Sequence, residues 1–109
     1  MILVPMQNHT TVSVKFRKAP YFALIQNDSI KIIKNEGRRL KGSQFLDYLQ
    51  TFQADSILVA NIGPKTAKRL IEHGYRLYMT HHPHIDKLRH IPLTPITLQT
   101  LFLATLGHR

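Results

Sequence analysis

The sequence predicts an α/β domain, with a mixed sheet of about five strands and helices packed on its faces. Short apolar runs of strand length lie between turn-forming residues, and longer segments repeat their apolar residues at helical spacing. The elements follow one another as strand, strand, strand, helix, strand, helix, strand, helix, an alternation typical of this fold class. A chain of 109 residues suits a single domain spanning residues 1–109.

The first three elements are predicted strands. Residues 2–4 form an apolar run that Pro5 should limit, because proline cannot donate to a sheet ladder. Residues 21–25 form a second run, and a turn at residues 26–29 leads into an alternating pattern that begins at Ile30. The short turn predicts that the second and third strands pair as a hairpin.

A helix and a buried strand follow. Ser43 is a fitting N-cap residue for the helix. Apolar side chains recur at helical spacing on one face of it, at Phe45, Leu46, Leu49 and Phe52. Residues 57–60 are apolar throughout, which predicts a central strand in a parallel arrangement.

The remaining elements are a helix, a strand and a last helix. Pro64 suits the first turn of the helix, and Gly74 suits its end. Residues 75–79 form the fifth predicted strand. Thr94 and the proline after it read as the cap and first turn of a last helix, which runs to Leu106.

The charge balance favours an anionic partner. Fifteen Lys and Arg face six Asp and Glu, so the formal net charge is +9. Nucleic acid, a phosphate-bearing ligand, an anionic metal cluster and an acidic protein surface all fit this balance, and so does a merely solvated surface. The chain has no cysteine, which excludes disulfides, thiolate nucleophiles and cysteine-ligated iron–sulfur clusters.

The sequence predicts a soluble, cytoplasmic binding protein rather than an enzyme. It contains no apolar run of membrane-spanning length, no targeting segment, no phosphate-binding glycine loop and no catalytic His or Ser motif. The six carboxylates are scattered, whereas a metal-dependent nuclease of this strand order would need several of them on the first strand.

Two segments are candidate anion sites. In the first, a strand runs through Asn61 and Gly63 into a helix that begins at Pro64, and Lys65 adds a charge beside the amides of the helix N-terminus. The same residues also favour the start of a helix in the absence of any ligand, because proline suits the first helical position. In the second, residues 15–18 place three cations around one aromatic ring. That loop could bind phosphates or stack on a base. Alternatively, its aromatic ring could pack in the core and hold the loop in place.

Histidines form a third candidate site. His81, His82 and His84 lie within four residues, and neutral imidazole binds iron, nickel, copper and zinc. The spacing matches no recognised zinc pattern, and loop histidines are usually solvated. If the first, fourth and fifth strands are parallel neighbours, these histidines, His9 and both candidate anion segments share one edge of the sheet. We therefore predict one basic, histidine-bearing pocket at that edge.

Three stretches together resemble a known family. VANIGPK at residues 59–65, with GYRLY at residues 74–78, is similar to the GNIGPKA…L…GIKVY stretch of dinitrogenase iron-molybdenum cofactor biosynthesis proteins. FRKAPYF at residues 16–22 resembles their HFGRAPYF loop, and ILVP at residues 2–5 resembles their first strand. Lys15 stands where the family loop has histidine, Arg17 where it has glycine, and Ala60 replaces a further glycine.

The resemblance implies a ribonuclease-H-like fold of about five strands. It also implies a role in binding or carrying an iron–sulfur or iron-molybdenum cofactor precursor, as in NifX, NafY and the C-terminal part of NifB. Our leading hypothesis is a non-enzymatic carrier, with a possible protein partner in cofactor assembly. The residues expected to bind the anionic ligand are Lys15, Phe16, Arg17, Asn61, Gly63, Pro64 and Lys65, and the candidate metal ligands are His9, His81, His82 and His84.

Two alternatives use other parts of the chain. A nucleic-acid-binding module would add Arg38, Arg39 and Lys41 to the basic loops and would show steep salt dependence. A protein-interaction domain would use the apolar surplus of the last predicted helix. Because that surplus suits a self-contact as well as a core, both a monomer and a homodimer fit the sequence.

Overall fold

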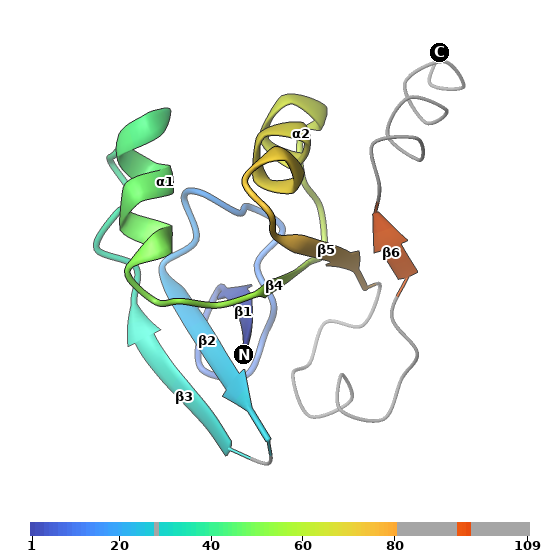
Figure 1. The fold of residues 1–109 in the computed structure, drawn as a ribbon. Coiled ribbons are helices and arrows are strands. Elements are labelled where there is room, and N and C mark those ends of the chain that lie inside the picture. The colour runs from blue at the N-terminus through green and yellow to red at the C-terminus, as the bar shows by residue number, and fades with distance from the viewer. Residues whose placement is uncertain (28, 81–93, 97–109) are drawn as a thin grey trace.

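The computed structural model describes residues 1–27, 29–80 and 94–96. The strands are β1 (Ile2–Met6), β2 (Tyr21–Gln26), β3 (Ser29–Lys34), β4 (Ser56–Val59), β5 (Arg76–Met79) and β6 (Thr94–Ile96). They form one six-stranded sheet in the order β3-β2-β1-β4-β5-β6 (Figure 1). The described helices are α1 (Ser43–Gln50) and α2 (Pro64–Glu72). The mixed α/β architecture predicted from the sequence is therefore confirmed.

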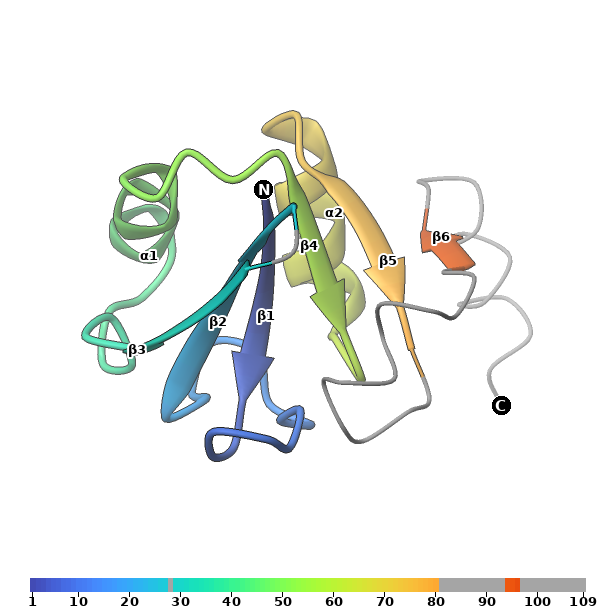
Figure 2. The ribbon, with the colours of Figure 1, turned by 90° about the horizontal axis from the view of Figure 1, so that it is seen from below.

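The sheet has an antiparallel half and a parallel half that meet at β1. The β2–β3 hairpin turns at Asn27, whose φ of 55° suits a tight turn, and β2 also pairs antiparallel with β1. On its other edge β1 pairs parallel with β4, and β4 pairs parallel with β5. The arrowheads of these three strands point the same way in Figure 2. The predicted parallel neighbours are therefore confirmed.

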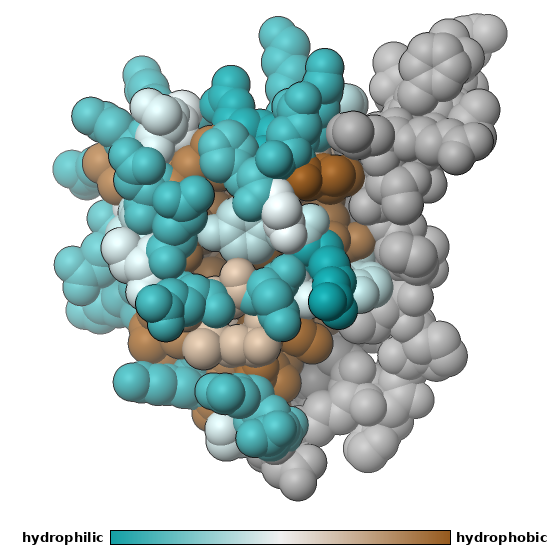
Figure 3. Space-filling model, in the orientation of Figure 1, coloured by the Kyte–Doolittle hydropathy of each residue, from teal (hydrophilic) through white to brown (hydrophobic). Residues whose placement is uncertain are grey.

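Both described helices lie on the same face of the sheet (Figure 1). Phe45 and Leu49 of α1 and Leu70 of α2 join buried side chains of β1, β2, β4 and β5 in one core cluster. Aromatic rings form much of it, and Phe22 lies between Phe45 and Phe52 with ring centroids 6.5 and 6.3 Å away. Hydrophilic side chains cover the molecule over the helices, while apolar ones gather lower down, over the sheet (Figure 3).

A second, smaller cluster lies on the opposite face. Val4 and Met6 of β1 pack there with Ala23, Leu58 and Val12. Val12 belongs to the loop after β1, which folds back so that an isolated bridge joins Met6 to Val12. Since alternate residues of β1 enter the two clusters, the strand is buried on both faces, as its continuous apolar sequence predicts.

Two predicted boundaries are wrong. Strand β1 continues through Pro5, which lies opposite Phe22 of β2. The Pro5 carbonyl accepts from the Ser13 amide at 2.9 Å, so the polar groups of Pro5 face away from β2, and the parallel pairing with β4 covers only Ile2 and Leu3. Helix α1 has Gly42 as its N-cap, with φ at 54° and no side-chain cap bond, so Ser43 is already the first helical residue. A sequence pattern places such ends only to within a residue or two.

The predicted last helix is wrong at its start. Thr94–Ile96 is strand β6, antiparallel to β5, with Thr94 opposite Met79 and Ile96 opposite Leu77. Pro95 lies in β6, which is the edge strand of the described sheet and has a pairing partner on one side only, a position where proline is tolerated. The rest of that predicted helix, including Leu106, lies outside the described residues. No helix in the described ranges has the length and apolarity needed to cross a bilayer.

The aromatic core should dominate the stability of the fold. We expect Phe22→Ala to lower the free energy of unfolding by about 3–5 kcal/mol, because the side chain is fully buried and leaves a cavity. Val14→Ala is the control, since Val14 is 65% exposed and its truncation should cost under about 0.5 kcal/mol. Urea denaturation of both variants measures the difference, and equal losses would contradict this account of the core.

Candidate anion-binding site

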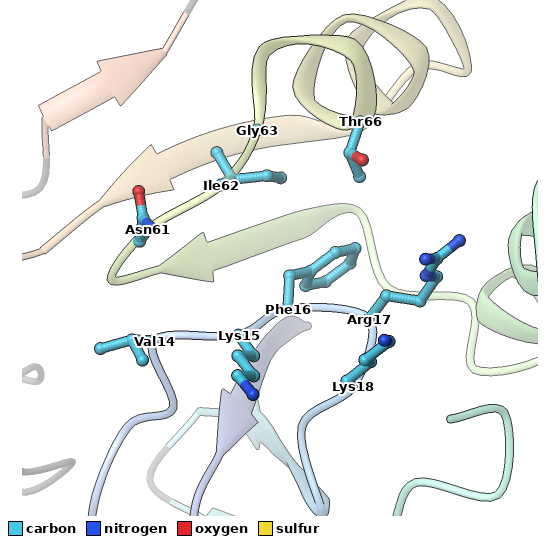
Figure 4. Close-up of a pocket in the computed structure, with 9 residues that line it drawn as sticks. All are labelled: Val14, Lys15, Phe16, Arg17, Lys18, Asn61, Ile62, Gly63 and Thr66. Carbon is cyan, nitrogen blue, oxygen red and sulfur yellow. The ribbon is translucent and has the colours of Figure 1, made fainter. Parts of the chain in front are cut away.

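Two loops meet where the parallel strands end. The loop after β1 and the loop between β4 and α2 leave the same edge of the sheet (Figure 2). Between them is an open cavity of about 290 Å³. Its lining, drawn in Figure 4, is Val14, Lys15, Phe16, Arg17, Lys18, Asn61, Ile62, Gly63 and Thr66. Ligand sites of open α/β sheets lie at this edge, so the cavity is the natural candidate site.

The cavity brings together five of the seven residues proposed from the sequence to bind the ligand: Lys15, Phe16, Arg17, Asn61 and Gly63. Pro64 and Lys65 begin α2 beside the cavity but do not line it. His9 is elsewhere, because its ring packs edge-on against Tyr21 at 5.2 Å. His81, His82 and His84 lie outside the described residues.

Four lining residues were not proposed from the sequence, namely Val14, Lys18, Ile62 and Thr66. Lys18 belongs to the basic run that was recognised, and Ile62 to the same turn as Gly63, so both could have been included. Thr66 is the third residue of α2, so the predicted helix start at Pro64 already placed it within one turn of Gly63. Val14 carries no signal in the sequence.

The basic loop is anchored by its aromatic residue. Phe16 is 5% exposed and packs on Phe45 with ring centroids 5.5 Å apart and nearly perpendicular. The prediction that Phe16 packs in the core is confirmed. The alternative that its ring stacks on a base is wrong, because the ring is not accessible to a ligand. In Figure 4 the side chains of Phe16 and Lys15 point in opposite directions. Burying the ring therefore turns the neighbouring cation outward.

A buried amide holds the same loop from the other end. Asn35, 4% exposed, donates from Nδ2 to the carbonyl oxygens of Arg17 and Ala19, both at 2.9 Å. Its Oδ1 accepts a hydrogen bond from the amide of Gly37 at 3.0 Å. One side chain therefore satisfies three backbone groups of two loops and fixes the loops relative to each other.

The start of α2 supplies backbone donors. The first intrahelical bond at this end runs from the Ala67 amide to the Gly63 carbonyl at 3.0 Å. Helix geometry leaves the amides of Lys65 and Thr66 with no carbonyl in a preceding turn, and the positive end of the helix dipole lies there. A Cβ built on Gly63 would meet no atom within 4 Å, so the backbone is open to a ligand at this point.

The charge of the cavity is not neutralised by nearby acids. Lys15, Arg17 and Lys18 line it together with no carboxylate. Over the described ranges, the ion pair observed joins the N-terminal ammonium of Met1 to Asp55 at 3.2 Å, on a different part of the surface. That ammonium lowers the pKa of Asp55 through a hydrogen bond. Unpaired cations around a hollow attract anions.

The described donor set does not favour metal ligation. Residues 1–27 and 29–80 contain no group of three His, Asp or Glu side chains placed to hold a metal ion. Protonated lysine and arginine are not metal ligands, but they hold an anion through charge and hydrogen bonds. The fold and the site together define a small α/β module whose cavity suits an anion.

The comparisons with known proteins identify the family. The family model described as "Dinitrogenase iron-molybdenum cofactor" matches residues 1–89. The chain therefore belongs to the dinitrogenase iron-molybdenum cofactor family, as the sequence motifs indicated. No curated protein matches the sequence.

Two solved structures share the fold. A crystal structure of a candidate dinitrogenase from Methanocaldococcus jannaschii superposes with a TM-score of 0.66 at 18% identity, over 88% of this chain and 93% of that one. An NMR structure of a candidate NifB protein from Thermotoga gives a TM-score of 0.60 at 16% identity, over 99% of this chain and 88% of that one. At these identities the likeness shows the fold alone.

Asn35 should contribute far more to stability than an exposed asparagine of the site. We expect Asn35→Ala to cost roughly 2–4 kcal/mol, because two carbonyls and one amide lose their partner in a largely buried place. Asn61→Ala makes the same change at an exposed position and should cost less than about 0.5 kcal/mol. Thermal unfolding of both variants measures the change in the free energy of unfolding. A small decrease in Asn35→Ala would contradict this account, because it would mean that water takes over the hydrogen bonds of the Asn35 side chain.

Proposed function

We propose that this protein is a non-enzymatic accessory protein that binds and carries an anionic metal-cluster precursor of the iron-molybdenum cofactor. The observation that carries the proposal is the cavity at the carboxyl ends of the parallel strands, lined by three cations and no carboxylate. Membership of the cofactor family supplies the class of cargo. An iron–sulfur or iron-molybdenum cluster with negative net charge fits such a lining.

Five lining residues and Lys65 have distinct roles in this proposal. Lys15 and Arg17 supply charge, and the guanidinium adds a planar pair of donors. Asn61 offers an amide donor from the opposite loop, and Gly63 lets the cluster approach the backbone. Lys65 lies one residue into α2, so its charge and its amide act on the same anion from the helix side. Phe16 positions the loop from the core.

Charge, rather than ligation, holds the cargo in this proposal. Lys15 stands where the related loops have histidine, which removes a ligand and adds a charge. His81, His82 and His84, which follow β5 in the sequence, are a separate set of proposed ligands. His9 is the weakest of the proposed ligands, since its ring packs on Tyr21.

The strand order of the sheet and the composition of β1 also bear on the proposal. The order β3-β2-β1-β4-β5, antiparallel in its first half and parallel in its second, supports a ribonuclease-H-like assignment. Strand β1 carries no carboxylate, which supports a binding role rather than nuclease chemistry.

We propose that the protein acts in the cytoplasm, as a monomer or homodimer, and passes its cargo to a protein partner.

Anaerobic loading tests the proposal. The protein is incubated with ferrous iron, molybdate and an iron–sulfur precursor, then desalted, and its visible absorption and metal content are measured. We expect retained metal that is lost in Lys15→Gln/Arg17→Gln and that falls as salt is raised, because screening weakens charge-held binding. Lys31→Gln/Arg76→Gln removes the same charge from exposed positions outside the cavity and should retain metal.

Two other outcomes would contradict parts of the proposal. If the Lys15/Arg17 variant retains metal and a variant with His81, His82 and His84 changed to Ala loses it, the histidines ligate the cargo and the charge-held site is wrong. If the unchanged protein retains no metal, the carrier function is wrong, although family membership and the fold stand.

A further inference from the structure

A second, larger hollow adjoins the candidate site. Its volume is about 640 Å³, and its lining is Arg17, Lys18, Arg38, Arg39, Leu40 and Lys41. Five of these six residues are cations and none is acidic. Arg17 and Lys18 line both hollows, so the cations form one continuous tract across them.

The two walls of this hollow are held together by contacts beneath them. One wall is the loop of Arg17 and the other is the segment between β3 and α1, and Asn35 joins them through its hydrogen bonds to Arg17, Ala19 and Gly37. The backbone N–H of Asn35 also donates to the carbonyl oxygen of Pro20 at 3.0 Å. The relative position of the cationic walls is therefore set before any ligand arrives.

The second wall is also fixed onto α1. The Glu36 amide donates to the Tyr48 hydroxyl at 2.9 Å, and Gly37 lies so close to that ring that a Cβ would come within 2.5 Å of Cδ2. The Leu40 amide then donates to the Gly37 carbonyl at 3.0 Å, which closes a turn. This turn carries Arg38 and Arg39 exposed at the rim of the hollow.

We propose that Arg17, Lys18, Arg38, Arg39 and Lys41 form a binding site for the phosphate backbone of a nucleic acid strand. Like charges gathered around one hollow repel each other, and a preformed arrangement of them is complementary to a ligand with repeated negative charges. The tract extends over both hollows, so a chain of phosphates fits it better than a single small anion. This inference does not depend on the proposed carrier function.

The recognition is independent of base sequence. The lining of both hollows contains one aromatic residue, Phe16, and its ring is buried in the core rather than open for stacking. Strand binding of this kind uses backbone charge, and it lacks the base-stacking contribution of about 1–3 kcal/mol per base that exposed aromatics supply. Affinity should therefore be moderate and strongly dependent on salt.

Fluorescence anisotropy with a labelled single-stranded oligonucleotide tests the site. We expect binding at low salt that is equal for two strands of different sequence. Arg38→Gln/Arg39→Gln/Lys41→Gln should weaken it roughly tenfold or more and lower the slope of log K against log salt by about 2, since each lost phosphate contact contributes about 0.7. Lys31→Gln/Lys68→Gln/Arg76→Gln removes three exposed cations outside both linings and should change binding less than about threefold.

Competition identifies the ligand class. Unlabelled oligonucleotide should displace the probe, inorganic tripolyphosphate should displace it only at much higher concentration, and polyglutamate should not compete at matched charge. Equal competition by tripolyphosphate would assign the tract to free polyphosphates, and stronger competition by polyglutamate would assign it to an acidic protein segment. Either result, or equal effects of the two triple variants, would overturn the proposal.

Metal retention by the same variants separates this site from the first. The Arg38/Arg39/Lys41 variant leaves Lys15, Asn61 and Gly63 unchanged, so anaerobic loading should be unaffected by it. A loss of oligonucleotide binding with normal metal retention supports a second site. Loss of both together would mean that the tract is part of the cavity already described.

Discussion

The position of β1 is the constraint on which the rest of the structure depends. This strand pairs antiparallel with β2 on one edge and parallel with β4 on the other, so it joins the hairpin half of the sheet to the crossover half. The parallel pairing brings the loop after β1 next to the loop after β4, although Lys15 and Asn61 are 46 positions apart in the sequence. If β1 ran the other way, its loop would leave the opposite edge and the cavity would not exist.

The two loops that carry the cations are positioned by uncharged residues. Phe16 enters the aromatic core and Asn35 satisfies three backbone groups, while the lysines and arginines between them make no ion pair in the described ranges. This division has a physical reason. Cations paired with acids would be screened from a ligand, whereas a buried ring and a buried amide fix the backbone without neutralising any charge.

The lining of the cavity after β1 and β4 differs from that of a metal-ligating site. Lysine and arginine hold an anion through charge and hydrogen bonds, which act at longer range and demand less exact geometry than coordination. The proposed carrier function requires release of the cargo, and an interaction that salt or a competing anion weakens suits release. Because Arg17 and Lys18 belong to both hollows, two different anions would meet at the same pair of side chains.

The sequence by itself determined the elements whose cause is local. Apolar runs predicted the strands from β1 to β5, proline and glycine predicted the ends of α2, and the two loop motifs predicted most of the cavity's polar lining. Only the tertiary structure decided what depends on distant partners. Strand β6 pairs with β5 where the local pattern favours a helix start, and Asn35, unremarkable in the sequence, joins two loops. The physical reason is that periodicity and turn chemistry record the preferences of neighbouring residues, whereas hydrogen bonds and charge clusters between remote segments arise only when the sheet order brings them together.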